Sequence, residues 1–366
     1  MASHIGRRKF LATLGGAAAA WPLAARAQQA TMPVIGVLSA EWPNLFSDRL
    51  RAFHDGLRET GYVEGRNLAI EYRWAEGRND RLPALAAELV RRQVTVIVST
   101  STPAVLAARA ATTTIPIVFF VAVDPIQLGL VTSLSRPGGN LTGVVTLNVE
   151  VAAKRLQLLH ELVPTATIVA LLVNPTSTAL AETTTRELET AARTMGLEFH
   201  VLHASSEREI DTAFATLVQL RAGALVIGAD ALFNSRSEQL AALTIRHRVP
   251  AIYQFREFVS PGGLMAYGST VLDTYRPLGV YTGRILKGEK PADLPVQQAT
   301  KVELVINMKT AKALALSIPM PLMPKRFARL LGARRCDLYR SRRQSNRRPS
   351  CCIVAASNWC VSARCW

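Results

Sequence analysis

The sequence predicts an α/β protein made of two doubly wound parallel-sheet lobes joined by a hinge. Two observations support this prediction. Short apolar runs alternate with longer segments whose apolar residues recur at helical spacing, which is typical of parallel sheets covered by helices. The alternation then pauses in the sequence RPGGN at 136–140 and restarts near residue 150. We therefore expect two similar halves that face each other across a cleft.

The first half of the sequence has the pattern of a regular succession of strands and helices. Its first helix, at 47–61, carries Leu50, Phe53 and Leu57 on one face and meets a natural stop at Gly61. Strands are expected at 33–39, 68–73, 94–98 and 115–123, and helices at 47–61, 80–92, 103–111 and 126–135.

The second half repeats this order. Its clearest buried strand is IVALLV at 168–173, which stops at Asn174-Pro175. The periodicity alone does not assign residues 250–318 to either lobe. Strands are expected at 168–173, 198–204, 224–230, 250–255, 264–268 and 302–306, and helices at 150–163, 177–195, 207–221, 234–247, 273–287 and 308–316.

Polar side chains follow the predicted strands at their carboxyl ends, where open α/β sheets bind ligands. The run at 94–98 is followed by hydroxyl residues, of which Thr102 is the expected N-cap of a helix that begins at Pro103. A helix N-terminus with hydroxyl groups suits an anion such as a carboxylate. Asp124, after the next strand, suits a cation. Together they predict a site for a zwitterion such as an amino acid.

The second half places Asn174 and Asp230 at equivalent strand ends, so both would face the first set across the cleft. Each of these polar residues also has a simpler role as a helix N-cap, worth about 1 kcal/mol. Tyr253, Phe255 and Tyr267 are candidate aromatic walls, with core packing as their simpler role. The candidate ligand-binding residues are Ser39, Ser99, Thr100, Ser101, Thr102, Asp124, Asn174, Asp230, Tyr253 and Tyr267.

The formal net charge of +16 is concentrated at the two ends of the chain. Residues 1–27 hold four basic residues and no acidic ones, while 325–366 hold eleven basic residues and one acidic residue, which leaves a net charge of about +2 for 28–324. The body of the protein is therefore close to neutral, and we expect no nucleic-acid partner.

The motifs of common enzymes and metal sites are missing from the body of the sequence. All five cysteines lie between residues 336 and 365, so the body has no cysteine nucleophile, thiolate metal site or disulfide. No histidine pair has the helical spacing of a metalloprotease site, and there is no Walker loop, dinucleotide fingerprint or G-x-S-x-G elbow. We expect neither an enzyme nor a cofactor.

The N-terminus has the features of an export signal. Arg7-Arg8 precede an Ala/Gly-rich apolar stretch, and A-x-A ends at Ala27, near which we expect cleavage. The arginine pair resembles a twin-arginine signal, although Gly6 stands where a Ser or Thr is usual. The apolar stretch is shorter than the roughly 20 residues of a membrane span. Residues 1–27 therefore predict a signal peptide, and the mature protein is expected in the periplasm.

Beyond residue 319 the apolar periodicity ends. Residues 320–366 form a basic tail rich in Arg, Ser and Cys, which we expect to be disordered or an aberrant terminus. A basic binding arm is the alternative interpretation of this tail.

Several long motifs, in order, carry a family resemblance. They are PVIGVL near the start, FHDGLRETGYVEGRNLAIEYRWAEG at 53–77, IPIVFFVAVDPIQLGLVTSLSRPGGNLTGV at 115–144 and PADLPVQQATKVELVINMKTAKALALSIP at 291–319. Over 33–319 the chain resembles the ABC-transporter substrate-binding protein family, which is exported and includes relatives that take up aromatic amino acids.

This resemblance implies the type I periplasmic binding fold, with two lobes joined by three crossovers. By analogy, lobe 1 would comprise 33–144 and 251–290, and lobe 2 would comprise 145–250 and 291–319. Four positions match motifs of the family, namely Thr102-Pro103-Ala104, Asp124-Pro125, Asn174-Pro175 and Asp230.

We therefore expect a monomeric periplasmic protein that closes around a small ligand and delivers it to an ABC permease in the inner membrane. The ligand would be an amino acid or a related carboxylate. Ser101 and Thr102 would bind its carboxylate, Asp124 or Asp230 its ammonium group, and Asn174 would add a hydrogen bond after closure. The alternative is an extracytoplasmic sensor that presents its ligand to a membrane receptor.

Overall fold

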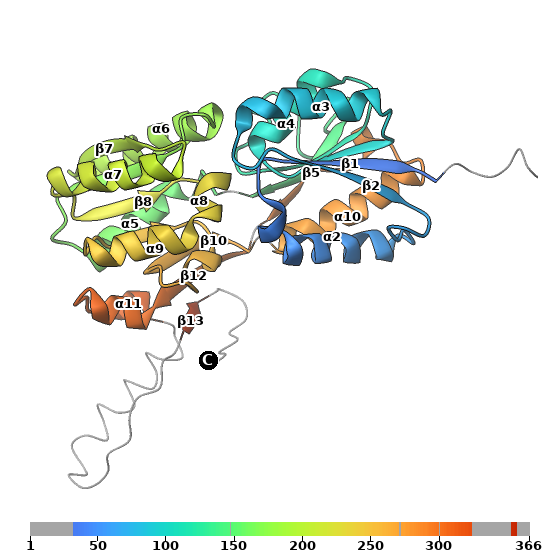
Figure 1. Ribbon diagram of the computed structural model, residues 1–366. Helices are drawn as coiled ribbons and strands as arrows, with labels where there is room; N and C mark the ends of the chain where they lie inside the picture. The colour runs from blue at the N-terminus through green and yellow to red at the C-terminus, as the bar shows by residue number, and fades with distance from the viewer. Residues whose placement is uncertain (1–31, 147, 271, 300, 324–352, 357–366) are drawn as a thin grey trace, which may run out of the picture.

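The computed structural model describes residues 32–146, 148–270, 272–299, 301–323 and 353–356. The predicted export signal at 1–27 and most of the predicted tail lie outside these residues. Figure 1 shows two lobes side by side, each with a sheet between layers of helices. The α/β fold with two doubly wound lobes is thereby confirmed.

The first lobe is built on a six-stranded sheet in the order β11-β5-β4-β3-β1-β2. Its pairs are parallel throughout, as expected for strands joined by helical crossovers. Burial on both faces explains the nearly continuous apolar runs of β3 and β4. The strands are β1 (Val34–Ser39), β2 (Ala69–Trp74), β3 (Val96–Ser99), β4 (Ile117–Val121), β5 (Leu141–Thr146) and β11 (Gln297–Ala299).

Helices cover both faces of this sheet. On one face, α3 (Leu82–Arg91) and α4 (Thr102–Ala111) pack against each other, and on the other face α2 (Ser47–Glu59) lies along α10 (Leu272–Leu286) (Figure 1). The contact between α2 and α10 is close because it is made at glycines. A β-carbon at Gly56 would collide with the carbonyl oxygen of Arg276, and one at Gly279 with that of Phe53. This contact brings side chains of α10 beside those of α2 under the cleft.

The second lobe has a seven-stranded sheet in the order β13-β12-β10-β9-β8-β6-β7. The pairs from β7 to β10 are parallel, while β12 is antiparallel to both of its neighbours. The strands are β6 (Ile168–Val173), β7 (Glu198–His203), β8 (Ala224–Ile227), β9 (Ala251–Tyr253), β10 (Met265–Ser269), β12 (Val302–Asn307) and β13 (Ile353–Ala356). The helices are α5 (Ala152–Leu162), α6 (Thr178–Thr194), α7 (Glu207–Gln219), α8 (Ala231–Ser235), α9 (Ser237–Arg246) and α11 (Met308–Ala313).

The chain crosses between the two sheets three times: between β5 and α5, between β10 and α10, and between β11 and β12. This division corrects the expected lobe boundaries. Residues 251–269, assigned to lobe 1 from the sequence, belong to the second sheet because β9 pairs with β8 and β10 with β9. Residues 297–299, assigned to lobe 2, pair with β5 in the first sheet.

Two local predictions also need correction. Residues 126–135 form turns instead of a helix, because Gly129 has a φ of +62° and the Asp124 side chain accepts a hydrogen bond from the Ile126 amide at 2.8 Å. Four residues of the predicted tail form β13, which pairs with the edge of β12. Such an edge offers unpaired backbone groups to any extended segment nearby.

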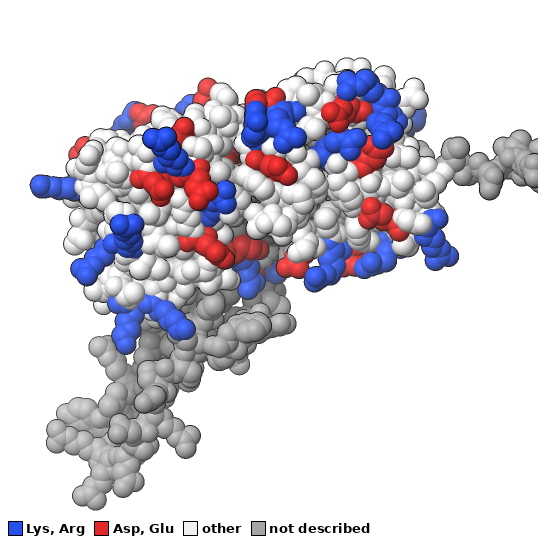
Figure 2. Space-filling view, viewed as in Figure 1, with Lys and Arg blue, Asp and Glu red and all other residues white. Residues whose placement is uncertain are grey.

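Charged side chains of both signs are interspersed over the face shown in Figure 2, in agreement with a nearly neutral body. Among the described residues, no helix combines the length and the apolar character that a membrane crossing requires.

Candidate ligand-binding site

A cavity lies between the two lobes at the carboxyl ends of their parallel strands. The space between its walls measures about 510 Å³ and includes volume that is open to solvent. The first lobe lines it with Ala40, Glu41, Arg49, Thr100, Ser101, Thr102, Pro103, Phe120 and Ala122, and the second with Leu180, Ala229, Asp230, Ala231, Asn234, Gln254 and Phe255.

The N-terminus of α4 opens into this cavity. The helix begins at Thr102, and Ser101 is its N-cap residue, one position earlier than the sequence predicted. The Ser101 hydroxyl does not cap the helix, because it accepts a hydrogen bond from the Ala40 amide at 3.3 Å. Thr102 Oγ1 accepts from the Ala122 amide at 3.4 Å. The first turn of α4 is thus without a side-chain cap, which suits an anion in the cavity.

A buried ion pair forms the wall beside this helix. Arg49 on α2 donates to Glu41, which follows β1, and the two side chains are only 12% and 7% exposed. The guanidinium lies over the rings of Phe46 and Tyr275, 5.4 and 6.0 Å from their centroids. Burial lowers the pKa of Arg49, but the charges of Glu41, Tyr275 and Glu257 and the hydrogen bond to Glu41 together outweigh it, so the pKa lies above its ordinary value.

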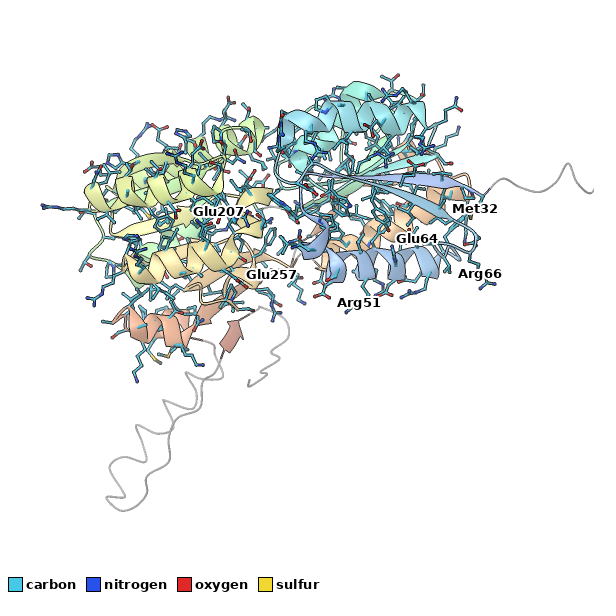
Figure 3. The ribbon with its side chains drawn as sticks, in the orientation of Figure 1. Met32, Arg51, Glu64, Arg66, Glu207 and Glu257 are labelled. Carbon is cyan, nitrogen blue, oxygen red and sulfur yellow. The ribbon has the colours of Figure 1, made fainter. Side chains whose placement is uncertain are left out.

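Hydrogen bonds across the cleft join this ion pair to the second lobe. Asn234 Nδ2 donates to Glu41 Oε1 at 3.2 Å, and Gln254 Nε2 donates to Asn234 Oδ1 at 3.2 Å. Glu257, which follows on η3 (Arg256–Phe258), contributes a further negative charge that raises the pKa of Arg49. Figure 3 shows Glu257 at the margin of the second lobe near the first. The lobes are therefore held together by polar groups at the cavity itself.

Asp230 forms the opposite wall, at the N-terminus of α8. Its Oδ1 accepts hydrogen bonds from Asn174 Nδ2 and the Leu232 amide, both at 2.9 Å, and its Oδ2 accepts from the Ser177 hydroxyl. Burial raises the pKa of Asp230, while the bonds from Ser177 and Asn174 act in the opposite direction. Asp230 is therefore a firmly positioned carboxylate that lacks a cationic partner among the described residues.

Several buried polar atoms around the cavity have no hydrogen-bond partner among the described residues. Thr100 Oγ1 and Gln254 Oε1 belong to lining residues that are 3% and 1% exposed. The hydroxyl of Tyr275 lies beside Thr100 and Arg49, and hydrogen bonding with these two groups acts to lower its pKa. Thr100 and Tyr275 can therefore satisfy each other, which leaves Gln254 Oε1 as the lining atom that indicates a polar ligand.

The structure brings some of the predicted residues to the cavity and leaves others away from it. Thr100, Ser101, Thr102 and Asp230 line it, as does Phe255. Asn174 lies behind Asp230 and orients it. Ser39 and Ser99 are fully buried at the strand ends below the lining; Ser39 Oγ accepts from the Glu41 amide at 3.1 Å.

Three further predicted residues lie outside the cavity lining. Asp124 is held by its own turn through the Ile126 amide. Tyr253 is completely buried and stacks on Phe258 with ring centroids 4.7 Å apart. Tyr267 packs against the core on the α5 side of the second sheet.

Among the polar and aromatic lining residues, the sequence analysis missed five: Glu41, Arg49, Phe120, Asn234 and Gln254. Glu41 lies two residues after the end of β1, and Gln254 lies one residue after the end of β9. The strand-end criterion that selected Ser39 would have found both if it had included the two residues after each strand. Arg49 and Asn234 come from helices, and no local pattern marks them. Among the described residues, no group of three His, Cys, Asp or Glu side chains is arranged to hold a metal ion.

The chain resembles a known protein family over most of its length. The family model described as ABC transporter substrate binding protein matches residues 42–326, which is most of the chain. The chain belongs to the ABC transporter substrate binding protein family. The resemblance noted in the sequence is thereby confirmed.

Characterised relatives and solved structures agree. The chain is 30% identical over 269 residues to the tyrosine-binding protein of Clostridioides difficile (strain R20291), covering 72% of this chain and 75% of that protein. The structure of the ABC domain in complex with L-Trp from Streptococcus pneumoniae is 26% identical with a TM-score of 0.72, covering 80% of this chain and 97% of the other. A conserved domain protein from Vibrio cholerae is 25% identical with a TM-score of 0.71, over the same shares of the two chains.

Proposed function

We propose that this family member is a periplasmic receptor that binds an α-amino acid between its lobes and delivers it to an ABC permease. The observation that carries the proposal is the pairing, in one cavity, of the uncapped N-terminus of α4 with the buried carboxylate of Asp230. The first suits a carboxylate and the second an ammonium group. An α-amino acid presents both groups on one carbon atom.

In this arrangement the ligand carboxylate binds at Ser101, Thr102 and the first amides of α4. The ammonium group binds Asp230, since Oδ2 accepts only one hydrogen bond from the described residues and retains a lone pair. Asp124, the alternative partner expected from the sequence, is occupied by its own turn outside the cavity lining. Asn174 acts by orienting Asp230.

The remaining walls suit an aromatic or apolar side chain. Phe120 and Phe255 line the cavity together with Leu180 and several alanines. Relatives support the same class: one is named for tyrosine, and another was crystallised with L-Trp. We therefore propose aromatic amino acids as the preferred ligands.

Delivery follows from closure about the three crossovers. The hydrogen bonds of Asn234 to Glu41, and of Asn79 to Thr176 and Ser177, join the lobes across the cleft and break when the lobes separate. The proposed signal at 1–27 would place the receptor in the periplasm, where the closed form, as a monomer, would dock on a permease of the inner membrane.

Calorimetric titration of the purified chain with the natural L-amino acids tests the binding proposal. We expect one site per chain with a preference for aromatic members. The matched controls are the N-acetyl and amide derivatives of the same amino acid, which each lack one charge and should bind at least tenfold more weakly. Equal binding of the amino acid and both derivatives, or binding of no α-amino acid, would contradict the proposal.

A further inference from the structure

We propose that Gln254 sets the specificity of this site by accepting a hydrogen bond from the side chain of the bound amino acid. The inference rests on the proposed function and goes beyond it. It states that the preferred ligand is an aromatic amino acid with a neutral hydrogen-bond donor on its ring, a phenol or an indole, and that phenylalanine is discriminated against.

The orientation of the Gln254 amide follows from the groups around it. Arg49 is always protonated and pairs with Glu41, which is therefore an acceptor only. Asn234 must then present its Nδ2 to Glu41, which turns its Oδ1 toward Gln254. Gln254 in turn must present Nε2 to that oxygen. The chain of bonds thus fixes which end of the amide is free, a choice that is otherwise ambiguous between amide O and N.

The free end is an acceptor with no partner. Gln254 is 1% exposed, its Oε1 lies within the closed protein, and no described residue donates to it. The residue lines the cavity, as do Asn234 and Phe255. A buried carbonyl oxygen left without a donor carries an energetic cost. A ligand that supplies a donor at this point removes that cost, whereas a ligand with an apolar surface there makes it permanent.

The ligand side chain is the appropriate source of this donor. The ammonium group of an amino acid is drawn to the carboxylate of Asp230, because hydrogen bonds between charged groups are about twice as strong as those to a neutral amide. Thr100 Oγ1, which lies beside the Tyr275 hydroxyl, can both donate and accept, so it does not discriminate between ligands. Gln254 Oε1 can only accept. The neighbouring rings of Phe120 and Phe255 favour an aromatic ring that carries the donor.

The closed arrangement is required for this selection. Glu41 and Arg49 belong to the first lobe, whereas Asn234 and Gln254 belong to the second. The Asn234–Glu41 bond, which fixes the orientation of the Asn234 amide and through it that of Gln254, therefore forms only when the lobes meet. The site therefore discriminates between ligands with and without a hydrogen-bond donor when the lobes close.

Titration of the full chain with L-tyrosine, L-tryptophan and L-phenylalanine tests the inference without any mutation. We expect L-phenylalanine to bind about 10- to 100-fold more weakly than the better of the other two, because it leaves Gln254 Oε1 unpaired. The variant Gln254→Met keeps the length of the side chain and removes the acceptor. Because it also removes the Nε2 bond to Asn234, binding of all three ligands should weaken, but that of L-tyrosine and L-tryptophan should weaken more, so the discrimination against L-phenylalanine disappears.

Gln239→Met is the matched control. Gln239 also has an unpartnered Oε1, but its Nε2 bonds Asp211 at 3.1 Å on the outer helices of the second lobe, and it does not line the cavity. This variant should keep the wild-type preference. Equal affinity for phenylalanine and tyrosine, or equal weakening of all three ligands by Gln254→Met, would overturn the role of Gln254 and leave the proposed function standing. Failure of any α-amino acid to bind would overturn both.

Discussion

Two arginines lie largely out of solvent where the lobes meet, and the protein holds them in different ways. Arg49, at the cleft, is paired with the carboxylate of Glu41. Arg155 on α5, at the hinge, is 1% exposed and donates to two backbone carbonyls, to Tyr267 O from Nε at 2.7 Å and to Asn148 O at 2.5 Å. No carboxylate of the described residues forms a salt bridge with it, and burial lowers the pKa of Arg155 to about 10.

The difference reflects what each region does. At the cleft, charges are compensated by side chains on both lobes, so a charged ligand can bind among them and couple to closure. At the hinge, Arg155 joins Asn148, just after the first crossover, to Tyr267, just before the second. A guanidinium that bonds backbone carbonyls fixes the positions of two crossing segments without depending on a ligand. The following predictions test this contrast, beginning with the largest effect.

Removing the Glu41 carboxylate at the cleft should cause the largest loss of folding stability. Glu41→Ala leaves the Arg49 guanidinium buried without its partner, and arginine cannot lose its charge as a carboxylate can. We expect the free energy of unfolding to fall by about 3 kcal/mol in urea denaturation. Glu59→Ala, which breaks an exposed pair with Arg276, is the control and should change it by less than about 0.5 kcal/mol. Similar losses in both variants would contradict the cleft account.

At the hinge, Arg155→Met should lower the free energy of unfolding by a smaller amount, about 2 kcal/mol. Two carbonyls lose their donor, but the cost of burying an uncompensated charge is relieved at the same time. Thermal and urea unfolding measure the loss, and Arg193→Met on the exposed surface of α6 is the control. A loss larger than that of Glu41→Ala would show that the hinge arginine, not the cleft pair, dominates stability.

The buried Asp230 predicts a pH dependence. Its pKa in the folded chain lies above the ordinary value of 3.8, so folding disfavours the ionised form. Relative to Asp230→Asn, wild type is most stable below pH 3.8 and loses stability as the pH rises through the folded pKa. The loss is about 1.4 kcal/mol for each unit by which the pKa is raised. Glu41 adds to this shift by its negative charge.

Unfolding of both proteins over a series of pH values measures this difference. The amide can keep the bonds to Asn174, Leu232 and Ser177, so the comparison isolates the charge. A difference that does not vary with pH would refute the assignment of a raised pKa to Asp230.

The smallest effect is expected at the outer rim of the cleft. Asn79 Nδ2 bonds Thr176 Oγ1 at 3.1 Å and Ser177 Oγ at 3.0 Å across the lobes, in a partly exposed position. Asn79→Ala should weaken affinity for the bound amino acid about twofold, because exposed hydrogen bonds contribute little net energy. A loss above about tenfold would mean that closure depends on the rim as much as on the cavity.

The fold could be predicted from the sequence because each strand and helix has its own apolar periodicity. Strand ends then located part of the site, since Thr100 to Thr102 and Asp230 follow strands whose carboxyl ends meet at the cleft. Asp124 satisfies the same criterion, but its carboxylate closes a local turn, and the sequence does not distinguish the two roles. Arg49 and Asn234 reach the cavity from helices on opposite lobes, so their proximity depends on tertiary packing and closure, which no local pattern encodes.

The lobe boundaries failed for a related reason. Strands β9 and β10 have the same local pattern as strands of either sheet, and only pairing with β8 decides their place. The crossovers at which the chain changes lobes carry no periodicity that would mark them.

A crystal structure of the chain grown with L-tyrosine tests the central claim most directly. The account predicts the amino acid between the lobes, with its carboxylate at the N-terminus of α4, its ammonium group on Asp230 and its phenol within hydrogen-bond distance of Gln254 Oε1. Closed lobes with an empty cavity, or the ligand bound away from these residues, would contradict it.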